Sequence, residues 1–296
     1  MPRRRASLFP VVLILLILGS VSGAGAEADS EDWGSVESWL TTSQIYDPPE
    51  PHRQQTVILL HGFGGSPFDL KPLALALRGS GFRLVIPVLP GETTSTPART
   101  RGVVTAEEKI SWLEGLIAEE TERFSRTPHL VGFSMGGSLA TIVAVQETLD
   151  RLVLVSPYYA LSWGNSFLPG LSRFFSSLLP VVPKPWKGQV NDPEGYRRYR
   201  PGSGTVSLHG FHRLQQLAER ARNSVADLPP LPTLVLASPD DEVASYTMTR
   251  RLFLGRPETE FLAFPGSNHI LFYDYGRDRA ITSVKEFLER ERPAQE

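Results

Sequence analysis

Short runs of apolar residues recur along the chain and predict strands that are buried on both faces. They lie at 56–60, 83–88, 128–133, 151–156, 233–237 and 260–264. Each run is continuous rather than alternating, as expected when helices cover both sides of a parallel sheet. Before the first run, only 36–45 is suited to a short edge strand or hairpin. The pattern therefore predicts one mostly parallel sheet at the centre of the molecule.

Between these runs, apolar residues recur at helical spacing and predict helices that cover the sheet. The predicted helices lie at 67–78, 137–146, 245–253 and 278–289, and a further helix opens at Thr105. Thr105 and Glu108 have the spacing of a capping box, which satisfies the free N–H groups of a first turn. Strands that alternate with helices of this length form right-handed βαβ units. The fold class predicted is α/β, with a doubly wound sheet.

The alternation breaks at 157–227, where about seventy residues separate two predicted strands. An apolar stripe with helical spacing runs through this segment: Phe167, Leu168, Leu171, Phe174, Phe175, Leu178 and Leu179. Six Lys or Arg and two acidic residues lie between 157 and 205. One interpretation is an ordinary amphipathic helix packed on the core. The favoured interpretation is a cap over a site, apolar inside and basic outside.

The first 26 residues have a composition of their own. Three arginines precede the apolar run 8–18, and small residues end in Ala24-Gly25-Ala26. This order is typical of a secretory signal peptide, so we expect residues 1–26 to be removed and 27–296 to form the mature domain. The protein is then exported, either periplasmic or secreted. The alternative is an uncleaved membrane anchor, although the run is shorter than the roughly 18 to 20 residues that a span needs.

Composition narrows the possible chemistry. Removal of the leader takes three arginines and no acidic residue, so the formal net charge of −2 becomes −5, which disfavours a nucleic-acid partner. The chain has no cysteine, so disulfides, thiolate catalysis and cysteine metal sites are excluded. A covalent mechanism in this chain must therefore use an oxygen nucleophile.

A glycine-flanked serine follows the predicted strand 128–133. Gly132-Phe133-Ser134-Met135-Gly136 matches G-x-S-x-G, the nucleophile elbow, and lies between a buried strand and a buried helix as that motif requires. In such a turn the serine backbone is strained, and a Cβ at either glycine would collide with the neighbouring turn. The motif predicts an exposed hydroxyl at a helix N-terminus, where the N–H of Met135 can face an oxyanion.

A second glycine-rich turn, His61-Gly62-Phe63-Gly64-Gly65, follows the strand 56–60. A phosphate-binding role is disfavoured because neither G-x-G-x-x-G nor a following Lys-Ser or Lys-Thr is present. We interpret the turn as an oxyanion loop in which the N–H of Phe63 approaches the same point as that of Met135. His61 is expected to brace this loop by hydrogen bonds rather than to act as a base.

The loops after the last two predicted strands carry partners for the serine. A serine hydroxyl needs a base to accept its proton, and the base needs a carboxylate to orient it. The order serine, acid, histidine is completed by an aspartate in Ser238-Pro239-Asp240-Asp241-Glu242-Val243 and by His269 in Gly266-Ser267-Asn268-His269. All of these lie at the carboxyl ends of strands, where doubly wound sheets place their sites.

With these motifs, the chain resembles the α/β-hydrolase family over nearly all of 27–296, and within it the small-capped carboxylesterases and monoacylglycerol lipases. The resemblance implies an α/β-hydrolase fold with a helical cap inserted after the sixth strand. It implies Ser134 as nucleophile and His269 as base, with Phe63 and Met135 as oxyanion donors. The acid is Asp240 or Asp241, and the family spacing favours Asp241, with Asp240 hydrogen bonding in its loop. One departure from the family pattern is Glu92, which follows Pro90-Gly91. At this point these enzymes usually have Gly-His.

The resemblance implies hydrolysis of short to medium acyl esters or monoacylglycerols through an acyl-enzyme, without metal or cofactor. Phe167, Leu171, Phe174 and Phe175 then line an acyl channel, and the partner is a small ester or lipid, with transient contact to a lipid interface. The same triad also suits an acyltransferase, thioesterase or peptidase. Ser134 argues against the dehalogenases and epoxide hydrolases of this fold, which need aspartate at the elbow. A non-catalytic binding protein is disfavoured because no triad member is missing.

Overall fold

The computed structural model describes residues 33–49, 53–92, 102–162, 181–183, 189–201 and 205–291. The N-terminal segment 1–26 and the four channel residues Phe167, Leu171, Phe174 and Phe175 lie outside the described residues. The part of the chain from Gly34 onward is one compact unit.

A seven-stranded sheet forms the centre of this unit, in the order β1-β3-β2-β4-β5-β8-β9. The strands are β1 (Gln44–Tyr46), β2 (Thr56–Leu60), β3 (Arg83–Ile86), β4 (His129–Phe133), β5 (Arg151–Val155), β8 (Thr233–Ala237) and β9 (Thr259–Ala263). All neighbours are parallel except β1, which pairs antiparallel with β3 at the edge. The predicted parallel sheet is therefore confirmed, including each of its six apolar runs.

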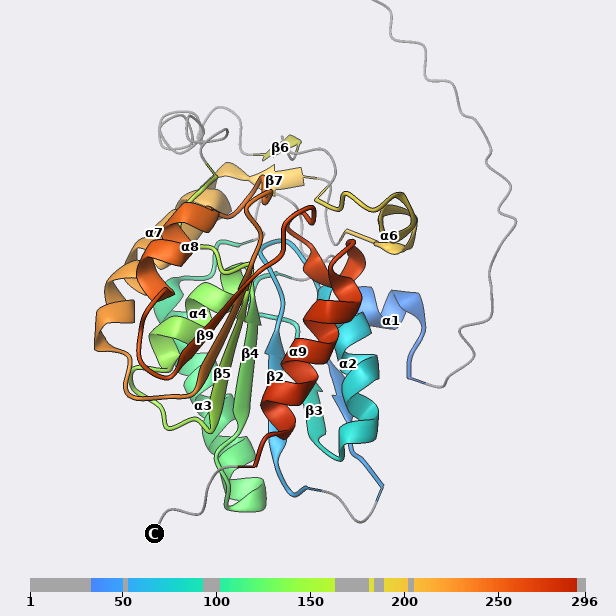
Figure 1. Cartoon of the computed structure of the whole chain (residues 1–296), viewed down its shortest axis with the longest axis vertical. Helices are drawn as coiled ribbons and strands as arrows, with labels where there is room; N and C mark the ends of the chain where they lie inside the picture. Colours follow the sequence, from blue (N-terminus) through green and yellow to red (C-terminus); the bar gives the residue numbers. More distant parts are fainter. Residues whose placement is uncertain are drawn as a thin grey trace, which may run out of the picture. The chain divides into compact units, whose positions relative to one another are not determined.

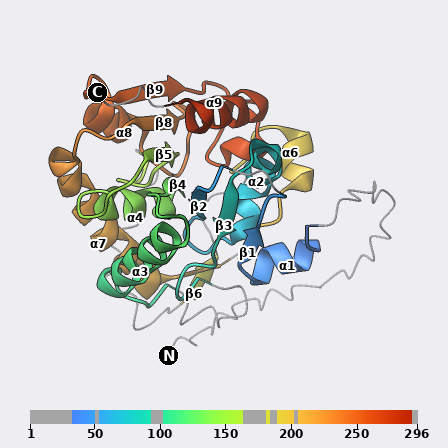
Figure 2. The same cartoon turned by 90° about the horizontal axis from the view of Figure 1, so that it is seen from below.

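Helices cover both faces of the sheet, as the continuous apolar strands require. Figures 1 and 2 show α2 and α9 on one face and α3, α4, α7 and α8 on the other. Their bounds are α2 (Lys71–Leu77), α3 (Ala106–Phe124), α4 (Met135–Val143), α7 (Leu208–Ser224), α8 (Tyr246–Phe253) and α9 (Arg277–Glu289). Thr105 caps α3 with the predicted reciprocal bonds to Glu108. The doubly wound α/β fold is thus confirmed.

The segment 36–45 was predicted as an edge strand or hairpin, and that prediction is wrong for its first half. Val36–Thr41 is a helix, α1, whose N-cap Ser35 accepts a hydrogen bond from the N–H of Ser38. The fully buried Trp39 holds the helix in place through packing that the local pattern did not reveal. Only the last residues of the segment enter the sheet, as the start of β1.

Other predicted boundaries moved by a few residues. The strand that begins at Arg83 ends at Ile86, because Pro87 has no N–H for the ladder. The helix expected at 67–78 begins as a 3₁₀ turn, η1 (Pro67–Leu70), before α2, and ends in another, η2 (Arg78–Ser80). These shifts leave the strand order and the loops at the strand ends unchanged.

The long insertion follows β5, the fifth strand of the described sheet, rather than the sixth. Its described parts are the antiparallel pair β6 (Val181–Pro183) and β7 (Thr205–Ser207), α6 (Pro193–Arg198), α7 and η5 (Val225–Asp227). Helix α7 buries Leu214, Leu217, Ala218 and Ala221 and packs along α4. The later part of 157–227 therefore belongs to the helical layer over the sheet.

None of the helices in the described ranges is both long and apolar enough to span a membrane.

Candidate active site

Ser134 occupies the sharp turn between β4 and α4. Its φ of 54° and ψ of −117° lie in a sparsely populated region that a side chain adopts only when its surroundings enforce it. A Cβ at Gly132 would come within 2.5 Å of the Gly136 carbonyl oxygen, and one at Gly136 within 2.4 Å of the Leu60 carbonyl oxygen. Both glycines are therefore needed to bring the helix this close to the strands. The geometry is that of a nucleophile elbow.

His269 and Asp241 complete a hydrogen-bonded chain with Ser134. The His269 Nε2 lies 2.9 Å from the Ser134 Oγ, and its Nδ1 lies 2.8 Å from the Asp241 Oδ2. Because the carboxylate accepts from Nδ1–H, Nε2 is left to accept the serine proton. All three residues are buried. Asp241 and His269 lie 28 positions apart in sequence, and Ser134 and His269 lie 135 positions apart. The structure thus brings together the residues that the sequence nominated as nucleophile, acid and base.

The two adjacent aspartates have different neighbours. The Asp241 Oδ1 accepts the N–H groups of Val243 and Ala244, each at 2.8 Å, which orients its other oxygen toward the imidazole. Asp240 is exposed and accepts the N–H of Gly266 at 2.7 Å instead. The geometry therefore supports Asp241 as the partner of His269 and gives Asp240 a bond within the neighbouring loop.

The glycine-rich turn after β2 lies beside the elbow, as the sequence predicted. The Leu89 N–H donates to the His61 Nε2 at 3.0 Å, and the Nδ1 of the same ring donates to the Gly62 carbonyl at 2.9 Å. Complete burial lowers the pKa of His61 to about 4. A neutral ring that bonds on both sides braces the loop, which confirms the role expected for this histidine.

Two backbone N–H groups, those of Phe63 and Met135, are available at the site. Within the described part of the chain neither donates to another residue, whereas the N–H of Gly65, two residues after Phe63, closes a turn with the Gly62 carbonyl at 3.1 Å. Met135 is the first residue of α4, so its N–H has no partner inside the helix. The two donors predicted for an oxyanion therefore lie on the glycine-rich turn after β2 and at the first residue of α4.

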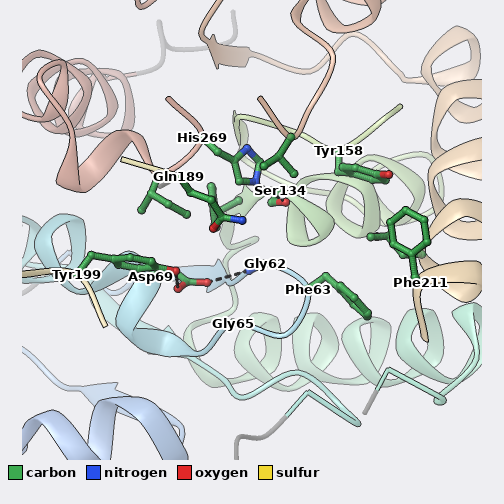
Figure 3. A pocket seen from close by; sticks show the side chains of 14 residues that line it. Gly62, Phe63, Gly65, Asp69, Ser134, Tyr158, Gln189, Tyr199, Phe211 and His269 are labelled. Carbon is green, nitrogen blue, oxygen red and sulfur yellow. Dashed lines mark hydrogen bonds between the residues drawn. The ribbon is translucent and has the colours of Figure 1, made fainter. Parts of the chain in front are cut away.

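A pocket opens over Ser134 and has two chemically different ends (Figure 3). Tyr199, Asp69 and Gln189 lie at one end, and the rings of Tyr158, Phe211 and Phe63 lie toward the other. Ser134 and His269 lie between these two groups. Such a pocket accepts a molecule with one polar part and one apolar part, with the reactive bond near its middle.

The polar end contains a buried carboxylate that sequence reasoning missed. The Asp69 Oδ1 accepts the hydroxyl of Tyr199 at 2.9 Å, and the Oδ2 lies 3.4 Å from the Gly62 N. Burial, reinforced by the negative charge of Asp69, raises the pKa of both Tyr199 and Tyr273 well above the ordinary value, so each keeps its phenolic proton. No motif marks Asp69, because its partner Tyr199 lies 130 positions away.

Asn268 and Asp274 hold the histidine loop, and they too were missed. The Asn268 Oδ1 accepts the N–H groups of Glu242 and His269, which ties the acid loop to the base loop. The fully buried Asp274 accepts four backbone N–H groups, those of Asn191, Asp192, Asn268 and Tyr275. The insertion is thereby attached to the loop that carries His269. The asparagine beside the histidine was visible in the sequence, but its partners were not.

The remaining predicted site residues cannot be placed. Phe167, Leu171, Phe174 and Phe175 fall outside the described ranges, so the acyl channel stays a prediction. In the ranges that are described, no group of three or more His, Asp or Glu side chains is arranged to hold a metal ion.

Comparison with known proteins agrees with the fold. The model of the alpha/beta hydrolase family matches residues 57–280, so the chain belongs to that family. A thermostable monoacylglycerol lipase from Bacillus sp. (strain H-257) is 24% identical over 78% of this chain and 89% of its own length. Monoacylglycerol lipase-like proteins are thus among its homologues.

Solved structures of such enzymes have the same fold. A monoacylglycerol lipase of Paleococcus ferrophilus superimposes with a TM-score of 0.70 at 23% identity, over 83% of this chain and 97% of that one. A soluble variant of the Saccharomyces cerevisiae monoglyceride lipase, in complex with a substrate analogue, gives 0.69 at 16% identity, over 83% and 90%. At these identities the structural likeness bears on the fold alone.

Proposed function

We propose that this protein is an exported serine hydrolase that cleaves carboxylic esters, either short to medium acyl esters or monoacylglycerols. The observation that carries the proposal is the chain of hydrogen bonds from Asp241 through His269 to Ser134, at 2.8 and 2.9 Å, at the base of a pocket. The similarity to a lipase of known name over most of both chains supports the ester as substrate.

In the proposed mechanism, the Ser134 Oγ attacks the ester carbonyl carbon while the His269 Nε2 accepts its proton. Asp241 holds the imidazole and stabilises its positive charge. The N–H groups of Phe63 and Met135 donate to the oxyanion that forms, an interaction worth most in the transition state. The imidazolium then protonates the departing alcohol, which leaves an acyl group on Ser134. Water repeats the sequence and releases the acid.

The two ends of the pocket suit the two halves of such an ester. The tyrosine and phenylalanine rings favour an apolar chain, and each methylene buried there contributes about 0.8 kcal/mol. The hydroxyl of Tyr199, the Asp69 carboxylate and the Gln189 amide offer hydrogen bonds to a polar part. An acyl channel along Phe167, Leu171, Phe174 and Phe175 would extend the apolar end.

The test is covalent labelling followed by kinetics. A fluorophosphonate probe should label the wild-type protein at Ser134 and leave Ser134→Ala unlabelled. Rates on p-nitrophenyl esters of increasing chain length then define acyl preference, and an added alcohol or thiol distinguishes hydrolysis from acyl transfer. A wild-type protein that neither reacts with the probe nor hydrolyses any ester of the series would contradict the proposal.

Export is proposed from the basic and apolar pattern of residues 1–26 alone. N-terminal sequencing of the protein recovered from periplasm or medium should begin near Glu27. Recovery of the intact N-terminus in the membrane fraction would favour the anchor instead. Transient contact with a lipid interface is part of the same proposal, and vesicle co-sedimentation tests it.

A further inference from the structure

Glu92 is a fully buried carboxylate next to the proposed oxyanion loop, and the mechanism above does not use it. Its Oε2 accepts the N–H of Gly64 at 2.9 Å. Gly64 has a φ of 59° and directly follows Phe63, whose N–H faces the oxyanion in the proposed function. The carboxylate thus bonds to the residue immediately after a proposed donor.

The turn that carries Glu92 holds the loop on both sides of that donor. The Glu92 N–H closes the turn by donating to the Leu89 carbonyl at 3.0 Å, and the Leu89 N–H donates to the His61 Nε2 at 3.0 Å. The turn therefore contacts His61 on one side of Phe63 and Gly64 on the other. A loop fixed at two points around one peptide leaves that peptide little freedom to rotate.

Lys109 supplies the counter-charge for this carboxylate. Its Nζ lies 3.4 Å from the Glu92 Oε1 and 3.3 Å from the Val104 carbonyl oxygen, and both charged side chains are almost fully buried. Burial lowers the pKa of Lys109, while Glu92 opposes that shift. A buried ion pair of this kind adds little stability over an apolar pair of equal volume, so stability alone is a weak reason for its presence.

We propose that Glu92 is a positioning residue, an inference that rests on the proposed function. Through its bond to Gly64 it fixes the Phe63 N–H for the oxyanion, and Lys109 is its counter-ion. The acceptor at position 92 carries the effect, and the charge keeps that acceptor in place. Loss of the acceptor leaves a buried N–H unpaired and lets the loop relax. Transition-state binding then weakens more than substrate binding does.

Two double variants separate the acceptor from the charge. Glu92→Gln with Lys109→Met removes both charges and keeps an oxygen that accepts from Gly64. Glu92→Met with Lys109→Met removes the charges and the acceptor at nearly equal volume. On p-nitrophenyl butyrate, we expect the first to stay within about threefold of wild-type kcat and the second to lose about 10- to 100-fold, with KM changed less than threefold.

A matched control is the buried pair at the other end of the sheet, Arg83 and Glu120, replaced by Met at both positions. It should keep wild-type kcat, which would show that removing a buried ion pair does not by itself lower kcat. Phosphonate labelling rates should fall in parallel with kcat, and thermal melting checks folding. If the variant with methionine at 92 does not fold, Glu92→Asp decides, because its shorter carboxylate falls short of Gly64 and should lose about fivefold or more in kcat.

Equal kcat in the two double variants, whether both normal or both low, would overturn the positioning role, as would normal kcat in Glu92→Asp. An inactive wild type would overturn the proposed function together with this inference. An active wild type with unaffected Glu92 variants would overturn the inference alone.

Discussion

The two ends of the central sheet both hold buried polar side chains, but they hold them differently. At the amino end, the first residues of four parallel strands, Thr56, Arg83, His129 and Arg151, lie within bonding distance of the carboxylates of Glu120 and Asp150. Arg83 bonds to Glu120 at 2.9 Å, and Thr56 bonds to the same carboxylate at 2.7 Å. At the carboxyl end, Ser134, Asp241 and His269 form a hydrogen-bonded chain that includes no lysine or arginine.

The difference shows what distinguishes a site from a structural network. Although burial opposes its charge, Glu120 and Asp47 raise the pKa of Arg83, so the amino-end group keeps one charge state. At the carboxyl end the backbone of Ser134 is strained, and Ser134 and His269 border a pocket. Buried polarity therefore does not identify chemistry by itself. A proton that can move along a chain of hydrogen bonds, beside open space, does.

The largest effect that would break this comparison comes from Ser134→Ala or His269→Ala. Each should lower kcat on p-nitrophenyl esters by about 10⁴-fold or more, because triad members work as a unit. Folding should be preserved, as checked by thermal melting and circular dichroism. Turnover comparable with the wild type in either variant would remove the triad from the mechanism.

The adjacent aspartates provide the next largest contrast. Asp241→Asn should cost about 10³- to 10⁴-fold in kcat, because an amide in place of the carboxylate disturbs the histidine tautomer. Asp240→Asn is the matched control, since it differs by one position and its carboxylate accepts from the Gly266 N–H rather than from the imidazole. Its kcat should stay near that of the wild type, and the reverse ranking would reassign the acid.

At the opposite end of the sheet, Glu120→Gln should affect stability without affecting catalysis. The substitution removes the negative charge that compensates the buried positive charge of Arg83. We therefore expect the free energy of unfolding to fall by about 3 kcal/mol. Urea titration measures this fall, and kcat on the same ester should be unchanged. A large loss of kcat in the folded variant would show that the two ends are coupled.

His61 lies at the carboxyl end yet functions structurally, so its titration sharpens the comparison. Its pKa is lowered from 6.5 to about 4 by burial, so the unfolded chain binds a proton at pH values where the folded chain does not. The neutral His61 side chain therefore contributes to the free energy of unfolding above pH 6.5. This contribution, about 3 kcal/mol in total, is lost as the pH falls toward 4.

His61→Gln keeps a donor and an acceptor but does not titrate, so it isolates this contribution. Urea titrations of both proteins at pH 7 and pH 4.5 should show a smaller loss of stability on acidification in the variant. An equal loss in both proteins would mean that His61 does not contribute to acid sensitivity.

The smallest expected effect is that of metal removal. The proposed mechanism uses only side chains and backbone N–H groups, so EDTA should leave the rate unchanged. Loss of activity that added zinc or calcium restores would contradict a metal-free reaction.

Much of the fold could be predicted from local pattern. The strand Thr56–Leu60 and the strand Thr233–Ala237 have the predicted bounds, because a strand buried on both faces must be apolar throughout. The helix after Thr105 was marked by its own capping residues. Val36–Thr41 was misassigned because its helix depends on burial of Trp39, a distant contact that no periodicity records.

The sequence by itself determined the elbow at Ser134 and the order of nucleophile, acid and histidine, because glycine spacing and strand ends encode these locally. The spacing favoured Asp241 over Asp240, and the tertiary structure decided that Asp241 meets the imidazole. It also decided that Asp69 faces Tyr199 and that Glu92 holds Gly64. These pairs lie 28 to 130 positions apart, and such partners are selected by how strands and loops pack in space. Apart from the family spacing that favours Asp241, the sequence carries no local signal for these choices.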